Sequence, residues 1–392
     1  MKILHILSDW IICDYVPRLM QKCPGEHYFV RFVPPSQVNK KFKYIGNDLN
    51  VRRVACPSDL YLALVEDMSF DYVWQHGIYG GQERFLLRNH HPRKVIWSTW
   101  GFDYSRYGVQ WLFGVRTTLR LFRYLPARTI FKKFFVWLLQ NTRLLFVLPF
   151  NLVKVLPKID YYSVVVPSEE VFMRKLLSKR AKRIDFNYIS DQPLVKKYTK
   201  VNLDSHHILL GNSADITNNH LDVLPMLKKC EGYHVLVPLS YDYNGEGKSV
   251  YQTDVIKHAR KLLGENFTPL VDFLPYDEYV KLTQKCSVYI FGHRRQKALG
   301  NVDMALRRGA LVFMNDVSPV FKFYRDNGMR LYSLSELKKR GIKDILNEFR
   351  PWQQYNIDKF NKLRSHDVLL SQVQATLRRL EDDLVASKSW HD

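Results

Sequence analysis

The chain alternates short apolar runs with segments of helical periodicity. In the first half the apolar runs are KILHIL, HYFVRFV, FDYVWQHG and RKVIWSTWG. The second half repeats the rhythm with HHILLGN, YHVLVPL, TPLVDFLP, CSVYIFGH and ALVFMND, separated by helix-like stretches such as DEYVKLTQK. Strands that alternate with helices are typical of mainly parallel sheets covered by helices. The pattern therefore predicts an α/β fold with two nucleotide-binding-type domains in series that face each other.

A domain boundary is predicted near residues 191–205, which are polar, contain Pro193 and lack sustained periodicity. A chain of 392 residues is also longer than one ordinary core uses. We expect an N-terminal domain over residues 1–200 and a C-terminal domain over residues 201–350. Residues 351–392 are predicted to be helical and to pack back on the body.

Composition adds a strong positive charge. Lys and Arg outnumber Asp and Glu by 59 to 38, giving a net charge of +21. This charge favours a polyanionic partner such as nucleic acid, an anionic membrane or phosphorylated substrates.

The five cysteines are scattered and include no CxxC pair, so neither a disulfide framework nor a zinc site is indicated, and a reducing cytosol fits best. Asp9 and Asp14 interrupt the apolar N-terminus, which favours a buried strand over a signal peptide.

The basic charge concentrates in residues 105–160, which hold ten Lys or Arg residues against Asp160 alone. Four apolar residues there share one helical face and three arginines flank it: Leu112, Val115, Leu119 and Phe122, with Arg116, Arg120 and Arg123. Such a face is typical of a helix at a membrane interface, and two core helices with solvated edges are the alternative. The apolar run that follows is nearly long enough to span a bilayer, but residues 140–143, Gln-Asn-Thr-Arg, lie in its middle and disfavour spanning.

A junction in the second half predicts a ligand site. Gly211, Asn212 and Ser213 follow an apolar run, and two asparagines, Asn218 and Asn219, precede a predicted helix. In a parallel α/β domain, ligands bind at the carboxyl ends of strands, where a helix N-terminus presents unpaired N–H groups. A diphosphate would use the close backbone approach at glycine and all of these donors at once. The alternative is that the polar residues only cap the helix.

Further strand ends are expected at the same sheet edge. VLVPLSY ends one strand in a turn, FLPYDEY begins a helix, and Arg294 and Arg295 follow the next strand end. A basic pair together with helix N-termini neutralises a leaving diphosphate without metal. The chain also contains no Asp-x-Asp sequence, a common signature of divalent metal binding. We therefore expect metal-independent chemistry and no cofactor.

Five segments together resemble glycosyltransferase family 56: WSTWGFDY, ILLGNSADITNNH, VLVPLSY, FLPYDEYVKLTQKC and IFGHRRQKALGN. The resemblance spans most of the chain and is densest over residues 206–316. It implies a GT-B fold, in which two Rossmann-like domains face each other across a cleft. From their own residue pattern, residues 105–160 are expected to form a basic amphipathic helical insertion in the N-terminal domain. The nucleotide-sugar donor would then be held by the C-terminal domain.

The resemblance also implies a reaction. A 6-deoxy amino sugar such as N-acetylfucosamine would pass from a dTDP- or UDP-sugar to an undecaprenyl-diphosphate-linked saccharide, without metal. The pathway would be bacterial surface polysaccharide synthesis, of enterobacterial common antigen or of O-antigen. The protein would lie peripherally on the cytoplasmic face of the inner membrane, with the anionic membrane surface as a further partner.

Carried over residue by residue, the resemblance implies three sets of donor contacts. The strand-end loop, with Gly211, Asn212 and Ser213, would contact the donor phosphates. The start of the following helix would add contacts from Asn218, Asn219 and His220. Ser240 and Tyr241 would line the nucleotide base, and Tyr279 would lie beside the nucleotide. The basic loop would face the leaving diphosphate, with catalytic roles for its arginines: Arg294, Arg295 and Gln296.

The acceptor-side base is expected in the N-terminal domain, because the acceptor hydroxyl arrives there. Asp103 is the first choice, Asp9 the second and His76 the third, and each follows a strand end. A carboxylate can deprotonate a hydroxyl at neutral pH where indole rings limit its solvation and raise its pKa. Those rings and the neighbouring glycine are the expected acceptor contacts: Trp97, Trp100 and Gly101. The alternatives are that Asp103 caps a helix and that His76 and Trp100 are core or sugar-stacking residues.

Two other functions stay open from the sequence. A nucleotide-sugar epimerase or hydrolase fits the same scaffold and needs no lipid contact. A nucleic-acid-binding protein fits the charge of +21, but the cations lie beside apolar faces and no recognisable RNA- or DNA-binding module is present, so it ranks last. Donor consumption that requires a lipid-linked acceptor separates the transferase from the epimerase or hydrolase.

Overall fold

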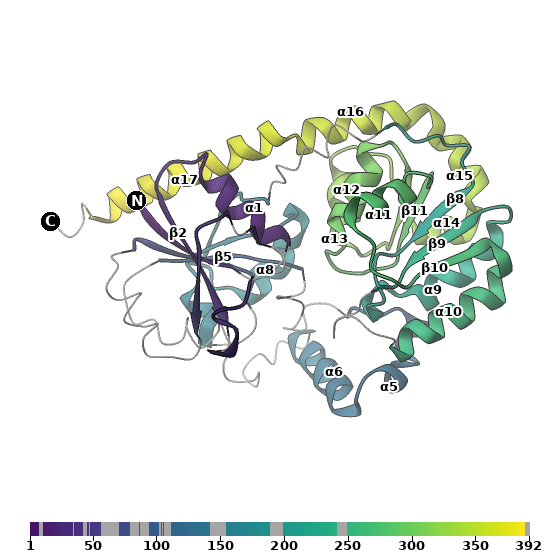
Figure 1. The fold of residues 1–392 in the computed structure, drawn as a ribbon, viewed down its shortest axis with the longest axis horizontal. Coiled ribbons are helices and arrows are strands. Elements are labelled where there is room, and N and C mark those ends of the chain that lie inside the picture. Colours follow the sequence, from purple (N-terminus) through teal and green to yellow (C-terminus); the bar gives the residue numbers. More distant parts are fainter. Residues whose placement is uncertain are drawn as a thin grey trace. The chain divides into compact units, whose positions relative to one another are not determined.

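The computed structural model divides into two compact units (Figure 1). We call the first the N-terminal unit, with Met1–Tyr107, Thr142–Gln192 and Arg364–Asp392, and the second the C-terminal unit, with Gly108–Asn141 and Pro193–Leu363. The structure describes residues 1–7, 11–33, 35–41, 45–46, 48–55, 70–78, 86, 94–101, 103, 105, 111–141, 154–188, 199–240 and 249–388.

The N-terminal unit is built on a seven-stranded parallel sheet with the order β3-β2-β1-β4-β5-β6-β7. Its strands are β1 (Lys2–Leu7), β2 (Glu26–Val33), β3 (Val51–Ala55), β4 (Tyr72–His76), β5 (Lys94–Ser98), β6 (Tyr161–Ser163) and β7 (Lys182–Arg183). Every residue of β4 is buried, as expected for a central strand covered on both faces. Strands are added on one side from β1 to β3 and on the other from β4 onward, so the switch point lies between β1 and β4.

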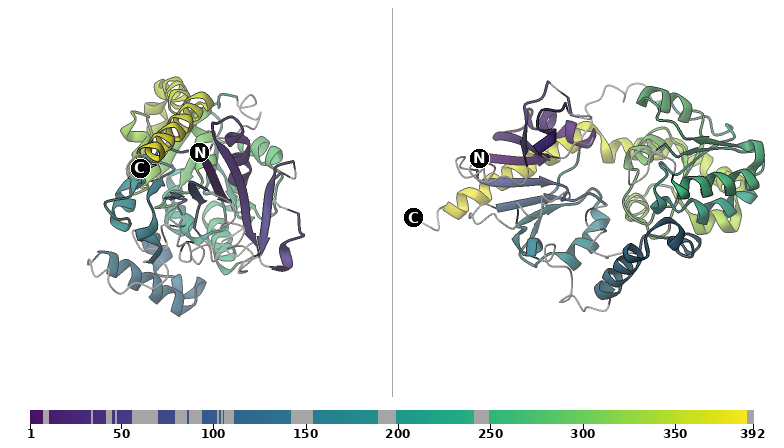
Figure 2. Two further views of the ribbon diagram at one scale, coloured as in Figure 1. Left: turned by 90° about the vertical axis from the view of Figure 1, so that its left-hand side faces the viewer. Right: turned by 60° about the horizontal axis from the view of Figure 1, so that its bottom comes forward.

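The core of the N-terminal unit forms between this sheet and two helices, α1 (Ile11–Met20) and α17 (His366–Lys388). A third helix, α8 (Glu170–Leu176), buries Met173 and Leu176. Four buried residues of α17 recur at helical spacing and join the core of the sheet: Leu369, Val373, Leu377 and Leu380. Tyr72 donates a hydrogen bond to the backbone oxygen of Leu380 (2.7 Å), and Tyr161 donates to Oδ2 of Asp383 (2.6 Å). The C-terminal helix therefore completes the N-terminal core (Figures 1 and 2).

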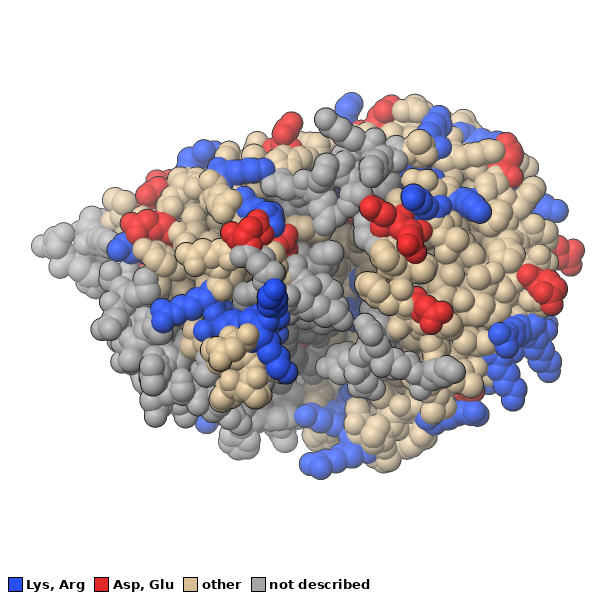
Figure 3. Space-filling view, in the orientation of Figure 1, with Lys and Arg blue, Asp and Glu red and all other residues tan. Residues whose placement is uncertain are grey.

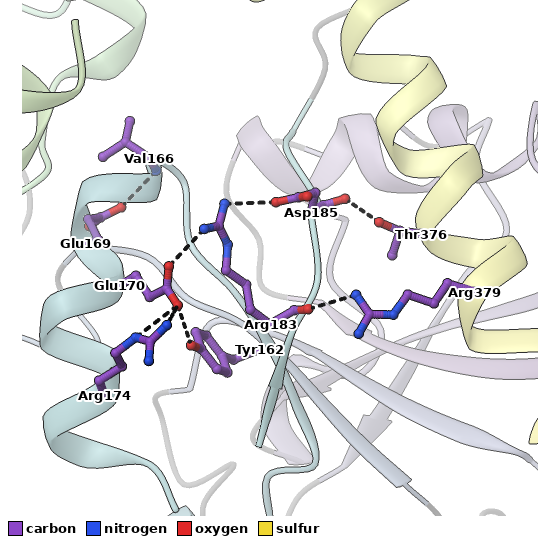
Figure 4. A network of polar contacts seen from close by, with 9 residues as sticks. All are labelled: Tyr162, Val166, Glu169, Glu170, Arg174, Arg183, Asp185, Thr376 and Arg379. Carbon is purple, nitrogen blue, oxygen red and sulfur yellow. Dashed lines mark hydrogen bonds and ion pairs between the residues drawn. The ribbon is translucent and has the colours of Figure 1, made fainter. Parts of the chain in front are cut away.

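A polar network also joins α17 to the edge of the sheet (Figure 4). Arg183 of β7 donates to Glu170 of α8 and to Asp185, both at 2.9 Å. From α17, Thr376 donates to the backbone oxygen of Asp185 (2.6 Å) and Arg379 to that of Arg183 (3.4 Å). These contacts satisfy backbone carbonyls at β7, a short strand that is the outermost of this sheet among the described residues.

The C-terminal unit holds a six-stranded parallel sheet with the order β10-β9-β8-β11-β12-β13. The strands are β8 (His207–Leu210), β9 (His234–Pro238), β10 (Phe267–Leu270), β11 (Val288–Phe291), β12 (Leu311–Met314) and β13 (Tyr332–Ser333). Its main helices are α9 (His220–Val223), α10 (Val250–Leu263), α11 (Tyr276–Thr283), α12 (Leu299–Arg307), α13 (Pro319–Asp326), α14 (Leu334–Arg340), α15 (Ile342–Phe349) and α16 (Gln353–Arg364). The switch point lies between β8 and β11. The prediction of two α/β domains with parallel sheets is confirmed.

The first part of the basic segment folds with the C-terminal unit. Its helices are α4 (Val115–Thr118), α5 (Leu121–Tyr124) and α6 (Ala127–Asn141). The Asp222 carboxylate of α9 accepts from the backbone N–H groups of Arg116 (2.7 Å) and Thr117 (3.1 Å), and from the Thr117 hydroxyl (2.6 Å). In α10, Asp254 accepts from Tyr124 (2.8 Å) and pairs with Arg123 (3.0 Å).

The sequence analysis assigned residues 105–160 to the N-terminal domain, whereas residues 108–141 belong to the C-terminal unit. The physical reason lies in Asp222 and Asp254, because each supplies a carboxylate that satisfies the N–H and hydroxyl donors of the segment. Charged acceptors of this kind hold a helix N-terminus firmly. Residues 142–153 lie outside the described part of the chain.

Candidate active site

Two glycines lie at the switch point of the C-terminal sheet. Gly211 follows β8 with a φ of +71°, and a Cβ atom there would lie 2.4 Å from Nε2 of His220. Gly292 follows β11, and a Cβ atom there would lie 2.3 Å from the backbone oxygen of Asn218. Neither position has room for a side chain, so the loops that follow the two strands approach each other closely. Ligands of parallel α/β sheets bind at such a place.

Adjacent asparagines in the first loop have different roles. The Asn219 amide donates to the backbone oxygens of Gly292 (3.0 Å), Leu112 and Thr217 (both 3.1 Å), and its oxygen accepts from the backbone N–H of Gly114 (2.8 Å). Asn219 therefore ties the basic segment to the end of β11 and is structural, although the sequence analysis placed it at the donor.

Asn218 points into the site instead. Its amide nitrogen donates to Ser213 and to the backbone oxygen of Asp215 (3.0–3.1 Å). Its side-chain oxygen is buried and has no hydrogen-bond partner in the described part of the chain. This oxygen can therefore accept a hydrogen bond from a bound ligand.

His220 presents a ring nitrogen at Gly211. The Tyr251 hydroxyl accepts from the backbone N–H of His220 (3.0 Å) and lies 3.1 Å from its Nδ1. When the hydroxyl donates to Nδ1, the ring proton lies on Nε2, where it faces Gly211. Burial lowers the pKa of His220 to about 3, so the ring is neutral. Its Nε2 has no partner among the described residues.

Other buried polar atoms gather at the same sheet edge. His293 follows Gly292 at the end of β11, and both of its ring nitrogens are buried without a partner among the described residues. Further atoms in this condition belong to residues after β8 and β12: the side-chain oxygens of Asn212 and Ser318. Native proteins pair nearly all such atoms with protein groups, ordered water or a ligand, so this sheet edge can satisfy the hydrogen bonds of a polar ligand.

A buried ion pair sets the charge of the site. Lys297 lies 3.0 Å from Oδ2 of Asp215, while the other oxygen of Asp215 accepts from the Thr217 N–H and hydroxyl. Burial alone would raise the pKa of Asp215, but the charges of Lys297 and Arg295 and the bonds from Thr217 hold it well below its ordinary value. Burial lowers the pKa of Lys297 to about 8 against the opposing effect of Asp215.

We call Asp215, Asn218, His220, His293, Arg295 and Lys297 the switch-point cluster. Near pH 7 the cluster has a net charge of plus one: Asp215 is negative, Arg295 and Lys297 are positive, and His220 and His293 are neutral. The helix α12 begins directly after it, and its N-cap residue, Ala298, makes no side-chain hydrogen bond to the first turn. A positive cluster beside an uncapped helix N-terminus suits an anion such as a diphosphate.

On the N-terminal unit, Asp103 is fully buried. Its carboxylate accepts from the backbone N–H of Trp100 (2.9 Å), the indole N–H of Trp97 (3.0 Å) and the backbone N–H of Ile78 (3.4 Å). Asp103 therefore organises the chain segments that follow β4 and β5. The sequence analysis treated the indole rings as an apolar screen, whereas Trp97 is a hydrogen-bond donor to the carboxylate because a buried indole N–H needs an acceptor.

His76 ends β4 at the N-terminal switch point and is also fully buried. Its Nε2 lies 3.0 Å from Nδ1 of His5, and its Nδ1 lies 3.2 Å from the Tyr188 hydroxyl. Burial lowers the pKa of His76 to about 3. The indole N–H of Trp100 donates to the same hydroxyl at 2.6 Å, and Trp97 and Trp100 are core residues with exposed fractions of 0% and 5%.

Comparison with known proteins decides the class. Residues 171–362 match the model of the family described as 4-alpha-L-fucosyltransferase, glycosyl transferase group 56. The protein is a glycosyltransferase. Over its matched residues it carries the group 56 pattern that the sequence resemblance indicated.

Solved structures share the fold of this glycosyltransferase. Sucrose-phosphate synthase from Thermosynechococcus elongatus aligns over 98% of this chain and 100% of its own, with a TM-score of 0.69 and 12% identity. The lipopolysaccharide outer core galactosyltransferase WaaB aligns over 99% and 100%, with a TM-score of 0.58 and 11% identity. Anabaena HepE in complex with UDP-glucose aligns over 99% of both chains, with a TM-score of 0.54 and 11% identity. The fold is therefore GT-B, with two Rossmann-like domains.

The glycosyltransferase brings part of the predicted donor set together. Gly211, Asn218, His220 and Arg295 meet at the C-terminal switch point, and Ser213 accepts from Asn218 there. Of the other predicted donor residues, Ser240 is half-buried just after β9, and Tyr279 lies within α11. The backbone oxygen of Gln296 accepts a hydrogen bond from Arg295. Two predictions, Tyr241 and Asp9, lie outside the described residues, and Gly101 is buried beside Trp100.

Arg294 differs from its neighbour Arg295. Its Nε donates to the backbone oxygen of Trp111 (3.0 Å). Burial lowers the pKa of Arg294, and the negative charges of Asp222 and Asp316 oppose this shift. Asp215, the carboxylate of the switch-point cluster, is not among these charges. Arg294 therefore supports the basic segment, and Arg295 is the arginine that belongs to the switch-point cluster.

Sequence reasoning missed three members of the cluster, His293, Lys297 and Asp215. All three lie in the quoted segments GNSADITNNH and FGHRRQK. A histidine directly after a strand-end glycine was the available signal for His293. The sequence offered no signal for the pairing of Asp215 with Lys297, because 82 positions separate the two residues and their contact depends on the fold.

The ionisation of Lys297 makes anion binding depend on pH. We expect the affinity for a nucleoside diphosphate to fall as the pH rises above about 8, because the free protein then loses the ammonium proton that the bound anion retains. The phosphate groups are fully ionised throughout that range and add no slope of their own. Calorimetric titration at pH 7, 8 and 9 measures the effect, with up to about tenfold loss per pH unit above the pKa.

Lys297→Met removes the titrating group, so its weaker affinity should be the same at pH 7 and pH 9. The control is Lys322→Met, at an exposed lysine paired with Asp326, which should keep the wild-type dependence. A wild-type affinity that does not change between pH 7 and pH 9 contradicts the role of Lys297.

Proposed function

We propose that the protein transfers a sugar from a dTDP- or UDP-sugar to a lipid-diphosphate-linked saccharide, as in bacterial surface polysaccharide synthesis. The resemblance to family 56 favours a 6-deoxy amino sugar such as N-acetylfucosamine and an undecaprenyl-diphosphate-linked acceptor. The switch-point cluster carries the proposal, because its buried unpartnered atoms and net positive charge suit a diphosphate. HepE, which shares the fold, was solved with UDP-glucose.

The chemistry of the leaving group follows from the same residues. When the bond between the sugar carbon and the diphosphate breaks, negative charge grows on the departing oxygen. Arg295 and Lys297 supply two cations beside it, and the first turn of α12 supplies N–H groups. Such preorganised charges stabilise the transition state without a metal ion. We therefore propose metal-independent transfer.

Nucleotide binding tests this proposal at its first step. Calorimetric titration of the protein with dTDP and UDP in the presence of EDTA should give saturable binding by at least one of them. Adding lipid-linked acceptor to the matching nucleotide sugar should then release the nucleoside diphosphate. Donor turnover that needs no acceptor would instead favour the epimerase or hydrolase, and binding lost in EDTA would contradict the metal-independent step.

An exposed apolar and basic surface supports the proposal of a lipid-linked acceptor. Within the described residues, no helix combines the length and the apolarity needed to cross a bilayer. On α4, α5 and α6 and in the turn between α4 and α5, however, four large apolar side chains are between 63% and 77% exposed: Val115, Leu119, Phe122 and Phe131. Lys and Arg side chains flank tan surface at the bottom of Figure 3, where Figure 1 shows α5 and α6.

Exposed apolar groups beside cations suit an anionic membrane surface, where burial and charge attraction add. The structure changes two details of the predicted face. Leu112 is buried beneath it, and Arg123 is held in an ion pair with Asp254. Arg116 is exposed, and its side chain forms no ion pair with another residue that the structure describes. We propose that Val115, Leu119, Phe122 and Phe131 enter the membrane interface with Arg116 and Arg120 beside them.

Changing three of these apolar residues together should release the protein from membranes. We expect Leu119→Ser, Phe122→Ser and Phe131→Ser combined to weaken sedimentation with anionic vesicles by about tenfold or more, because the apolar part of interfacial binding scales with the area buried. Activity should fall on lipid-linked acceptor and stay on a short soluble analogue. Phe273→Ser is the control, because Phe273 is 64% exposed elsewhere on the same unit. Equal vesicle binding by wild type and triple variant would remove the membrane from the account.

A further inference from the structure

Asn218 is a buried side chain whose orientation is fixed. It lies in the loop after β8 and is 0% exposed. Its amide nitrogen donates to the backbone oxygens of Ser213 (3.0 Å) and Asp215 (3.1 Å) and to the Ser213 hydroxyl (3.1 Å). Backbone oxygens only accept hydrogen bonds, so the amide nitrogen must face them and the side-chain oxygen must face the other way. Oδ1 of Asn218 is therefore a hydrogen-bond acceptor with a fixed direction.

The acceptor at Asn218 lacks a donor within the described part of the chain. Its Oδ1 and Nε2 of His220 are both buried, and neither has a hydrogen-bond partner among the described residues. The two atoms lie on the same side of the loop, because an ideal Cβ atom at Gly211 would be 3.3 Å from Oδ1 and 2.4 Å from Nε2. A buried acceptor that stays unpaired weakens the state that contains it. The loop therefore favours a bound state in which a donor reaches Oδ1.

His293 adds a further acceptor at the same sheet edge. Its side chain is 0% exposed, and neither of its ring nitrogens has a partner among the described residues. Burial and then the charges of Lys297 and Arg295 hold the pKa of His293 well below its ordinary value, so the ring is neutral. A neutral imidazole has one donor nitrogen and one acceptor nitrogen. The switch-point cluster thus presents acceptors as well as cations.

A diphosphate alone does not satisfy these acceptors. Above pH 7 the phosphate groups of a nucleoside diphosphate are largely ionised and offer acceptor oxygens. Those oxygens suit the cations Lys297 and Arg295, but at Oδ1 of Asn218 they would set lone pairs against lone pairs. The ligand that satisfies the whole cluster is a diphosphate joined to a group with hydroxyl or amide hydrogens. A nucleotide sugar has this chemistry.

Charge explains why an acceptor matters here. The free nucleoside diphosphate carries one more negative charge than the nucleotide sugar, because the oxygen that was bonded to the sugar is ionised after transfer. A cluster with a net positive charge attracts the more negative ligand more strongly. With cations alone, the site would bind its product more tightly than its substrate. An acceptor oxygen acts in the opposite sense when only the substrate brings a hydrogen to it.

We propose that Asn218 selects the intact nucleotide sugar over the free nucleoside diphosphate, because its Oδ1 accepts a hydrogen bond from a hydroxyl or amide N–H of the transferred sugar. This inference rests on the transfer reaction proposed above and adds to it a residue that determines specificity. The nucleoside also offers hydroxyl groups, but it is common to substrate and product, so contact with it gives no selection. Once the sugar has been transferred, Oδ1 loses its donor and the product binds less tightly.

Three ligands with the same nucleoside separate the contributions: dTDP, its β-methyl ester and dTDP-N-acetylfucosamine. The ester has the charge of the nucleotide sugar but no donor group beyond the diphosphate. Calorimetric titration of the wild type at pH 7 in EDTA should show the nucleotide sugar binding at least about tenfold more tightly than the ester. Equal affinities would overturn the proposal. The matching UDP ligands replace these if only UDP binds.

Asn218→Ser removes the acceptor oxygen. We expect the ratio of the affinities for nucleotide sugar and ester to fall by about tenfold. The ratio is the informative quantity, because a general disturbance of the loop weakens both ligands and cancels from it. A wild-type ratio in the folded variant would overturn the role of Asn218.

Asn356→Ser is the matched control. Asn356 of α16 is also 0% exposed, but its oxygen accepts from the backbone N–H of Arg330 and its nitrogen donates to the backbone oxygen of the same residue, both at 2.8 Å. Its loss should lower thermal stability and leave the ratio of affinities unchanged. A ratio that falls equally in both variants would assign the effect to lost packing and overturn the proposal.

NMR of the side-chain carbonyl carbon gives a second measurement on protein labelled at asparagine, which does not depend on the stability of Asn218→Ser. The shift of this carbon responds when the carbonyl oxygen gains a hydrogen bond. The Asn218 signal should move when dTDP-N-acetylfucosamine binds and stay near its unliganded position with dTDP. Equal movement with both ligands would contradict selection by the transferred sugar.

The remaining outcomes separate the two proposals. If the wild type binds neither dTDP nor UDP and transfers no sugar, the proposed function fails. If Asn218→Ser weakens dTDP, ester and nucleotide sugar equally but leaves pyrophosphate unchanged, Asn218 contacts the nucleoside. If it changes the affinity for none of them, Oδ1 pairs with water alone. Either of the last two results leaves the function standing and overturns the role of Asn218.

Discussion

Gly211→Ala is expected to abolish nucleotide binding, with a loss of affinity of at least about 100-fold, equivalent to about 2.8 kcal/mol. The added Cβ would lie 2.4 Å from Nε2 of His220. That ring cannot retreat, because Tyr251 holds both its backbone N–H and its Nδ1. The collision therefore falls on the loop that the phosphates must approach. Calorimetric titration with dTDP or UDP measures the loss.

The control for this change is Gly232→Ala. Gly232 has a φ of +84°, close to the +71° of Gly211, but a Cβ atom there would meet nothing within 4 Å. Both variants should pay the cost of left-handed backbone, about 1 kcal/mol, and Gly211→Ala should lose further thermal stability through its collision with His220. Only Gly211→Ala should lose nucleotide. Equal nucleotide affinity in the two variants would show that the phosphates do not bind at this loop.

Arg295→Gln should lower turnover by about 100-fold while changing the affinity for the donor by less than about threefold. The reason is that the guanidinium lies in the switch-point cluster, where its charge acts on Asp215, His293 and Lys297. Negative charge on the diphosphate grows as the sugar departs, so the cation contributes more to the transition state than to the bound donor. Steady-state kinetics with varied donor separate the two effects.

Arg294→Gln is the matched comparison, one position away in the same loop. Its Nε donates to the backbone oxygen of Trp111, so we expect lower thermal stability and a turnover within about threefold of wild type. Turnover that falls equally in both variants would place the whole loop in the chemistry. Turnover that falls only in Arg294→Gln would reverse the assignment.

The fold followed from the sequence because buried parallel strands are nearly continuous apolar runs, and these were visible in both halves. The basic segment was misplaced for a physical reason. Its nearest neighbours in sequence are the strands of the N-terminal unit, but its donors are satisfied by Asp222 and Asp254, about a hundred positions further along. Helical periodicity reveals an apolar face and says nothing of which distant carboxylate will hold it.

The site was predictable where backbone geometry dictates the residue. Gly211 at a strand end needs a positive φ and close approach, and the rule for parallel sheets finds it. Asn218 and Asn219 could not be told apart from sequence, because the left-handed conformation of Asn219 turns its side chain toward the basic segment. Asp103 stays a predicted base, and the three donors on its carboxylate come from contacts that the sequence does not show.

The most direct test of the account is the mass of the acceptor after reaction. Purified protein, a dTDP- or UDP-linked amino sugar and an undecaprenyl-diphosphate-linked saccharide are combined in EDTA, and both products are quantified. The account predicts that the acceptor gains the mass of one sugar residue and that nucleoside diphosphate appears in equal amount, only when acceptor is present. An acceptor of unchanged mass, while the donor is consumed at the same rate with or without it, would contradict the claim that this protein is a lipid-linked saccharide glycosyltransferase.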